Sequence, residues 1–72
     1  MGDRYADPPR AGVLLLHAPH DDRSKPEPVP VQVDDRGDGV LVWLDPWTGG
    51  TFGTGPGFPR LSTAYRWEVP RA

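Results

Sequence analysis

Hydrophobic and polar residues alternate along several short segments of the chain, which is the pattern of β-strands. In residues 61–69, LSTAYRWEV, every second position belongs to the set Leu61, Thr63, Tyr65, Trp67 and Val69. Aromatic and β-branched residues at a spacing of two are typical of a strand with one buried face. Apolar residues never recur at the helical spacing i, i+3, i+4, i+7, and prolines interrupt every candidate helix. The pattern therefore predicts an all-β protein.

Four further segments are predicted as strands, namely residues 13–18, 29–33, 40–44 and 50–52. Residues 40–44, VLVWL, are apolar at both parities, so we expect a central strand there. Residues 29–33, VPVQV, contain Pro30, which has no N–H to donate, so we expect this strand at an edge of the sheet. Residues 1–12 are polar with adjacent prolines and predict a disordered tail before one β domain at residues 13–70.

The connections between these segments indicate the architecture. Residues 34–39, DDRGDG, have the length of a hairpin, and residues 45–49, DPWTG, have the residues of a type I turn followed by a left-handed glycine. With a long first link and an irregular last one, residues 53–60, this loop order resembles that of an SH3-like barrel. An OB-like barrel or a strongly curved antiparallel sheet is the alternative. The aromatic signature residues of SH3 domains are missing, so no function is carried over.

Composition narrows the class of protein further. The 72 residues suffice for one domain, and the absence of cysteine excludes a disulfide framework and favours a reducing compartment. The only unbroken aliphatic run, residues 13–16, is too short to span a membrane, so we expect a cytoplasmic protein. Seven Arg against one Lys, with neither Ile nor Asn, are typical of a GC-rich genome such as that of an actinobacterium or its phage.

Charge is unevenly distributed along the chain. The net charge is −2, but residues 1–45 hold nine acids against five bases, while residues 46–72 hold three arginines against one glutamate. General attraction to nucleic acid is therefore not expected, although a local basic patch near the C-terminus is possible.

One short segment has the residue types of a metal site. The sequence HAPHDD places two imidazoles and two carboxylates within six positions, and these are natural ligands of divalent metals. The weak candidates are His17, His20, Asp21 and Asp22. Because Pro19 redirects the chain between the two histidines, we expect solvated residues here, with no metal and no cofactor. The two serines, Ser24 and Ser62, have no adjacent histidine, so we expect no enzyme activity.

Aromatic and arginine side chains offer a contact surface, because Trp and Arg are enriched at binding hot spots. The candidate partner-binding residues are Trp43, Trp47, Phe58, Arg60 and Arg66. They predict a protein-binding module that is not an enzyme and has an accessory or regulatory role. In one form of this hypothesis, the partner is a second copy of the chain, which binds through the Leu41/Trp43 face. Whether Trp43 is exposed or covered by the N-terminal segment is left open. The alternatives are single-stranded nucleic-acid binding through the same aromatics, and inhibition of a DNA-binding enzyme by acidic loops that mimic nucleic acid.

Overall fold

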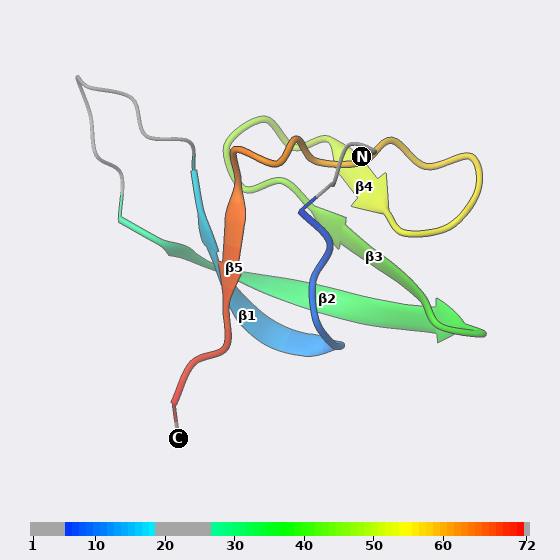
Figure 1. Cartoon of the computed structure of the whole chain (residues 1–72), viewed down its shortest axis with the longest axis horizontal. Coiled ribbons are helices and arrows are strands. Elements are labelled where there is room, and N and C mark those ends of the chain that lie inside the picture. The colour runs from blue at the N-terminus through cyan, green and yellow to red at the C-terminus, as the bar shows by residue number, and fades with distance from the viewer. Residues whose placement is uncertain (1–5, 19–26, 72) are drawn as a thin grey trace.

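Five antiparallel strands form one sheet in a computed structural model, which describes residues 6–18 and 27–71 (Figure 1). The strands are β1 (Gly12–His17), β2 (Val29–Gly37), β3 (Val40–Leu44), β4 (Thr51–Gly53) and β5 (Arg66–Glu68). Their order across the sheet is β4-β3-β2-β1-β5. The described part of the chain holds no helix, and hence none that could cross a membrane. The prediction of an all-β protein with five strands is confirmed; the sheet is not closed.

The long strand β2 is shared by two neighbours, each of which pairs with one half of it. Val29 to Val33 pair with β1, whereas Asp34 to Gly37 pair with β3. β2 lies in the middle of the strand order, but residues 29–33 have a neighbour on one side only, so the predicted edge position holds for this half of the strand. Pro30 is tolerated because β3 does not pair with this half of β2, so no neighbour on that side requires its missing N–H.

The last strand is shorter than the alternation at residues 61–69 predicts, since β5 contains only three residues. A turn at Ser62 takes the place of the first part of the predicted strand. The carbonyl oxygen of Ser62 accepts a hydrogen bond from the N–H of Tyr65 at 3.1 Å, and its hydroxyl accepts one from Ala64 at 2.9 Å. Serine favours such local turns over a strand ladder. The inward positions Leu61, Tyr65 and Trp67 nevertheless pack on the core, as their parity predicts.

The core lies on one face of the sheet. Its buried residues are Leu14, Leu16, Val31, Val33, Trp43 and Leu61. Burial of one such side chain stabilises the fold by about 1.5–3 kcal/mol. The ring of Trp67 on β5 meets that of Trp43 on β3 edge to face, at 5.3 Å between centroids. Since two strands separate β3 from β5 in the order, this contact requires the sheet to curve strongly around the core.

Trp43 is therefore an interior residue, only 2% exposed. Phe52 stacks on it at 6.4 Å, and Trp67 covers it from the other strand. The N-terminal segment in turn lies against Trp67, whose indole N–H donates to the carbonyl oxygen of Ala6 at 2.9 Å. Within the described residues, Ala6 already packs against the core, before residue 13, where we expected the domain to begin. The Leu41/Trp43 face, which we considered for self-association, is the inside of the sheet and packs on the core.

The glycine-rich connection after β4 is fitted closely to the sheet. A Cβ atom on Gly53 would lie 2.6 Å from Cγ of Phe58, so the Phe58 ring occupies the space that a side chain would need. Phe58 is half-buried, and the guanidinium of Arg36 lies over its ring at 6.0 Å. The carbonyl oxygen of Thr54 accepts from Arg60 at 3.3 Å. Phe58 is thus a packing residue against β4.

Candidate protein-interaction surface

The turn between β3 and β4 presents Trp47 to solvent. Asp45, which is 3% exposed, accepts the N–H of Trp47 at 2.9 Å and the hydroxyl of Thr48 at 3.0 Å. The N–H of Gly49 donates to the carbonyl oxygen of Asp45 at 2.8 Å, and Gly49 has φ of 78°. The predicted turn with a left-handed glycine is confirmed. It holds Trp47 in a fixed position with 39% of the residue exposed.

Trp47 is paired with an aromatic residue from the other end of the chain. The ring of Tyr65 lies 6.2 Å from that of Trp47, with an angle of 40° between the planes. Such separations are favourable for aromatic pairs. Tyr65 ends the turn that starts at Ser62 and directly precedes β5. Two turns, each with its own hydrogen bonds, therefore meet in one aromatic pair, of which Trp47 is exposed and Tyr65 is half-buried.

A shallow groove of about 410 Å³ continues from this pair along β5. The groove is lined by Ala6, Asp7, Pro9, Thr63, Tyr65, Arg66 and Trp67. Its walls come from the N-terminal segment on one side and from the turn and strand at residues 63–67 on the other. We call Trp47 together with these lining residues the Trp47 surface. It combines aromatic rings, a proline and one arginine, which are common at protein interfaces.

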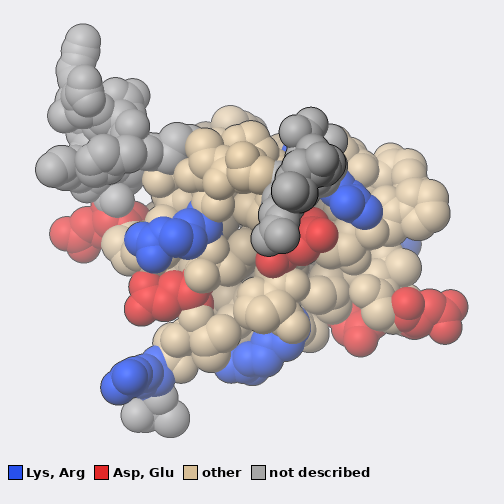
Figure 2. Space-filling model, viewed as in Figure 1, with Lys and Arg blue, Asp and Glu red and all other residues tan. Residues whose placement is uncertain are grey.

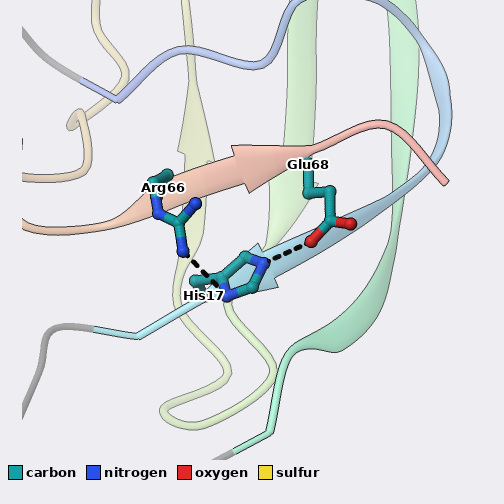
Figure 3. Close-up of polar contacts among 3 residues, drawn as sticks. All are labelled: His17, Arg66 and Glu68. Atoms are coloured by element: carbon teal, nitrogen blue, oxygen red, sulfur yellow. Dashed lines mark hydrogen bonds and ion pairs between the residues drawn. The ribbon is translucent and has the colours of Figure 1, made fainter.

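Arg66 is positioned by a histidine on the neighbouring strand (Figure 3). Its Nη2 atom lies 3.4 Å from Nδ1 of His17, and Nε2 of His17 lies 2.7 Å from Oε1 of Glu68. A guanidinium group can only donate, so Nδ1 accepts, and a neutral imidazole then carries its hydrogen on Nε2 and donates it to the carboxylate. The ladder explains this cluster, because His17 is opposite Arg66 and Leu15 is opposite Glu68.

The weak metal candidates are thus divided between this cluster and a part of the chain that is not described. His17 contacts Arg66 and Glu68, whereas His20, Asp21 and Asp22 lie outside the described residues. Within residues 6–18 and 27–71, no three side chains of His, Asp or Glu are grouped as metal ligands would be. An arginine beside the imidazole also opposes a cation there, because like charges repel.

The five predicted contact residues do not form one surface. Trp47 and Arg66 both adjoin Tyr65 and belong to the Trp47 surface. Trp43 lies in the core, so its ring is inaccessible to a partner in this conformation. Phe58 and Arg60 belong to the connection packed on β4.

Sequence reasoning missed Tyr65, Trp67 and Pro9 as parts of the surface. The alternation at residues 61–69 identified both aromatics, but only as inward residues of a strand. Comparison of the chain with protein-family models, with curated proteins and with solved structures found no match.

Proposed function

We propose that this protein is a non-enzymatic protein-binding module and that the Trp47 surface is its contact site. The observation that supports the proposal best is the exposed Trp47, which packs on the half-buried Tyr65 beside a groove lined by Tyr65 and Arg66. A large aromatic side chain exposed on a turn that is already rigid loses little conformational entropy on binding. Trp, Tyr and Arg are also the residue types in which binding energy concentrates.

The strand order supports an SH3-like architecture for the proposed module. A long central strand shared between two three-stranded groups, β5-β1-β2 and β2-β3-β4, is the arrangement expected for such a small barrel. Small barrels of this kind serve many unrelated functions, so the architecture by itself assigns none. It does favour a scaffold that presents its loops and turns, as the Trp47 turn is presented here.

The charges around the site favour a protein partner over a nucleic acid. Asp7 and Arg66 line the same groove, and Glu68 follows on the same strand. Figure 2 shows acidic and basic side chains interspersed over the visible face rather than gathered into one patch. Strong binding to a phosphate backbone requires several cationic contacts together.

Peptide display against the purified protein tests the proposal. Peptides selected on the wild type should lose at least about thirtyfold in affinity for Trp47→Ala, the effect of removing a hot-spot residue worth 2 kcal/mol. Val13, which is 50% exposed on β1 and does not line this groove, provides the matched control Val13→Ala. Selected peptides that bind both variants as well as wild type would refute the site.

A short single-stranded oligonucleotide separates the two ligand classes. Amide shifts at Trp47, Tyr65 and Arg66 that fade with added salt would replace the protein-binding proposal by the nucleic-acid one. We expect no such shifts.

A further inference from the structure

Strands β2 and β3 separate at one end of their hairpin. Their register contains only Asp34↔Val42, Asp35↔Leu41 and Gly37↔Val40, although β2 begins at Val29 and β3 continues to Leu44. In the separated region, β2 pairs only with β1, and β3 pairs only with β4. Figure 1 shows the two strands together at their hairpin and diverging away from it.

The free backbone groups of β3 face this gap. The N–H of Leu41 donates to Oγ1 of Thr54 at 2.9 Å, and its carbonyl oxygen accepts from the N–H of Thr54 at 2.9 Å, so Leu41 faces away from β2. Backbone groups alternate between the two sides of a strand. Val42 and Leu44 therefore direct their N–H and C=O groups toward β2.

The corresponding groups of β2 face the same gap from the other side. Asp34 is opposite Val42 in the register, and Gln32 and Pro30 share its parity. Gln32 and Leu44 thus face one another, but no register pair joins them. Pro30 has a carbonyl oxygen but no N–H to donate toward β3. This is a physical reason why the pairing of β2 with β3 stops before Pro30. Polar backbone groups in such a position need a partner from water or from another chain.

A groove of about 290 Å³ occupies the gap. Its lining includes Pro30, Gln32, Asp34, Val42, Leu44 and Pro46. Leu44 is 60% exposed, the largest fraction among the exposed apolar residues of the described chain. The volume is near the lower limit of about 300 Å³ for ligand pockets, so it suits one or two residues of a peptide. No residue of the Trp47 surface lines this groove.

The charge at the paired end of the groove is negative. Among the described residues, the carboxylate of Asp34 hydrogen-bonds only to Nε2 of Gln32, at 3.5 Å, and no Lys or Arg forms an ion pair with it. The exposed surface next to the apolar groove is thus anionic.

The geometry points to this groove as a second binding site, which takes an extended peptide segment of a protein partner with a Lys or Arg two positions from an apolar residue, so that both side chains lie on the same face. The main chain of the segment hydrogen-bonds to the free groups of Gln32 and Leu44, in the manner of strand addition. Its apolar side chain covers Leu44, and its cation pairs with Asp34. The site is independent of the proposed function of the Trp47 surface.

Amide NMR titration with two blocked peptides tests the inference. The probes are acetyl-Thr-Val-Thr-Lys-Thr-amide and its counterpart with Glu in place of Lys. We expect the Lys peptide to shift the amides of Gln32, Asp34 and Leu44, and to bind about threefold more tightly than the Glu peptide, the effect of one exposed ion pair. Leu44→Asp should abolish the shifts, whereas Val69→Asp, at an exposed residue just after β5, should leave them unchanged.

Charge-matched variants test the assignment of Asp34. Asp34→Asn should remove the preference for Lys over Glu, while Asp38→Asn should preserve it, because Asp38 lies in the hairpin turn and its φ of 54° suits asparagine. Dispersed spectra of all variants would show that they are folded. Absence of shifts at Gln32 and Leu44, or shifts confined to Trp47 and Tyr65, overturns the site. Equal binding of the two peptides overturns the chemistry that we assign to its ligand.

Discussion

Replacement of Gly53 by alanine tests how tightly the last connection packs on β4. The new Cβ atom would lie 2.6 Å from Cγ and 2.9 Å from Cδ2 of Phe58, and real Cβ atoms do not approach other atoms so closely. Phe58 therefore has to move. The main chain can accept the change, because Gly53 is not among the glycines with positive φ and pairs with Val42 as an ordinary strand residue.

The expected effect depends on the residue at position 58. Full burial of a Phe side chain contributes about 1.5–3 kcal/mol, so displacement of the half-buried Phe58 ring loses roughly half of that. Overpacking adds strain of about 1 kcal/mol. Restriction of the unfolded chain by alanine returns about 0.4–1 kcal/mol. Gly53→Ala should therefore destabilise the wild type by about 1–2 kcal/mol. It should cost much less in the Phe58→Ala variant, which lacks the ring and leaves only the Cβ atom of residue 58, at 3.0 Å, close to the new methyl group.

Urea unfolding of the four proteins of this cycle, followed by tryptophan fluorescence, measures the effect. A 72-residue domain is stable by roughly 4–11 kcal/mol, so the expected changes are resolvable. Gly50→Ala is the matched control. Its Cβ atom would lie at 3.5 Å from Oγ1 of Thr48 and at 3.6 Å from Cε2 of Phe52, which are ordinary contacts. Equal destabilisation by Gly53→Ala with and without the Phe58 ring would refute the packing argument.

Two further substitutions test the turn and the N-terminal contact. Asp45→Ala removes the acceptors of two hydrogen bonds and should destabilise the protein by about 1–2 kcal/mol in urea unfolding. Asp45→Asn, which keeps an acceptor for the N–H of Trp47, should lose about half as much, and equal losses would contradict the role of the turn. Trp67→Phe keeps an aromatic ring but removes the donor to the carbonyl oxygen of Ala6. The N–H of Ala6, which donates to the carbonyl oxygen of Leu61 at 3.4 Å, should then become less protected from hydrogen exchange. Unchanged exchange at Ala6 would show that the Trp67 hydrogen bond does not hold the segment.

Strand positions could be predicted because alternation and turn residues are local properties. The turn at Asp45–Gly49 is an example, since an acidic first residue and a glycine after the fourth suffice to specify it. The parity of Leu61, Tyr65 and Trp67 was likewise correct, even though Ser62 replaces most of that strand by a turn.

The arrangement of the strands could not be predicted, because it depends on contacts between distant segments. Pro30 indicated an edge, but not that the same strand is paired on both sides. One half of β2 pairs with β1 on one side, and the other half pairs with β3 on the other side. The pairing of Trp47 with Tyr65 depends on the curvature that the core imposes on the sheet. His17 was expected to be a solvated residue at a strand end, but it contacts Arg66 and Glu68, partners that follow from a strand pairing that no local signal indicates.

The pairing of β5 with β1 has a consequence for folding. The residues joined by the His17–Glu68 contact are separated by 51 positions, and β1 is the only strand to which β5 is paired. Contacts of such long separation slow folding, because much chain entropy is lost before they form. During synthesis β1 is made long before β5. Until β5 arrives, β1 has an open edge and Trp43 lacks the covering ring of Trp67. The strand that is made first is thus the one exposed longest to pairing with other chains.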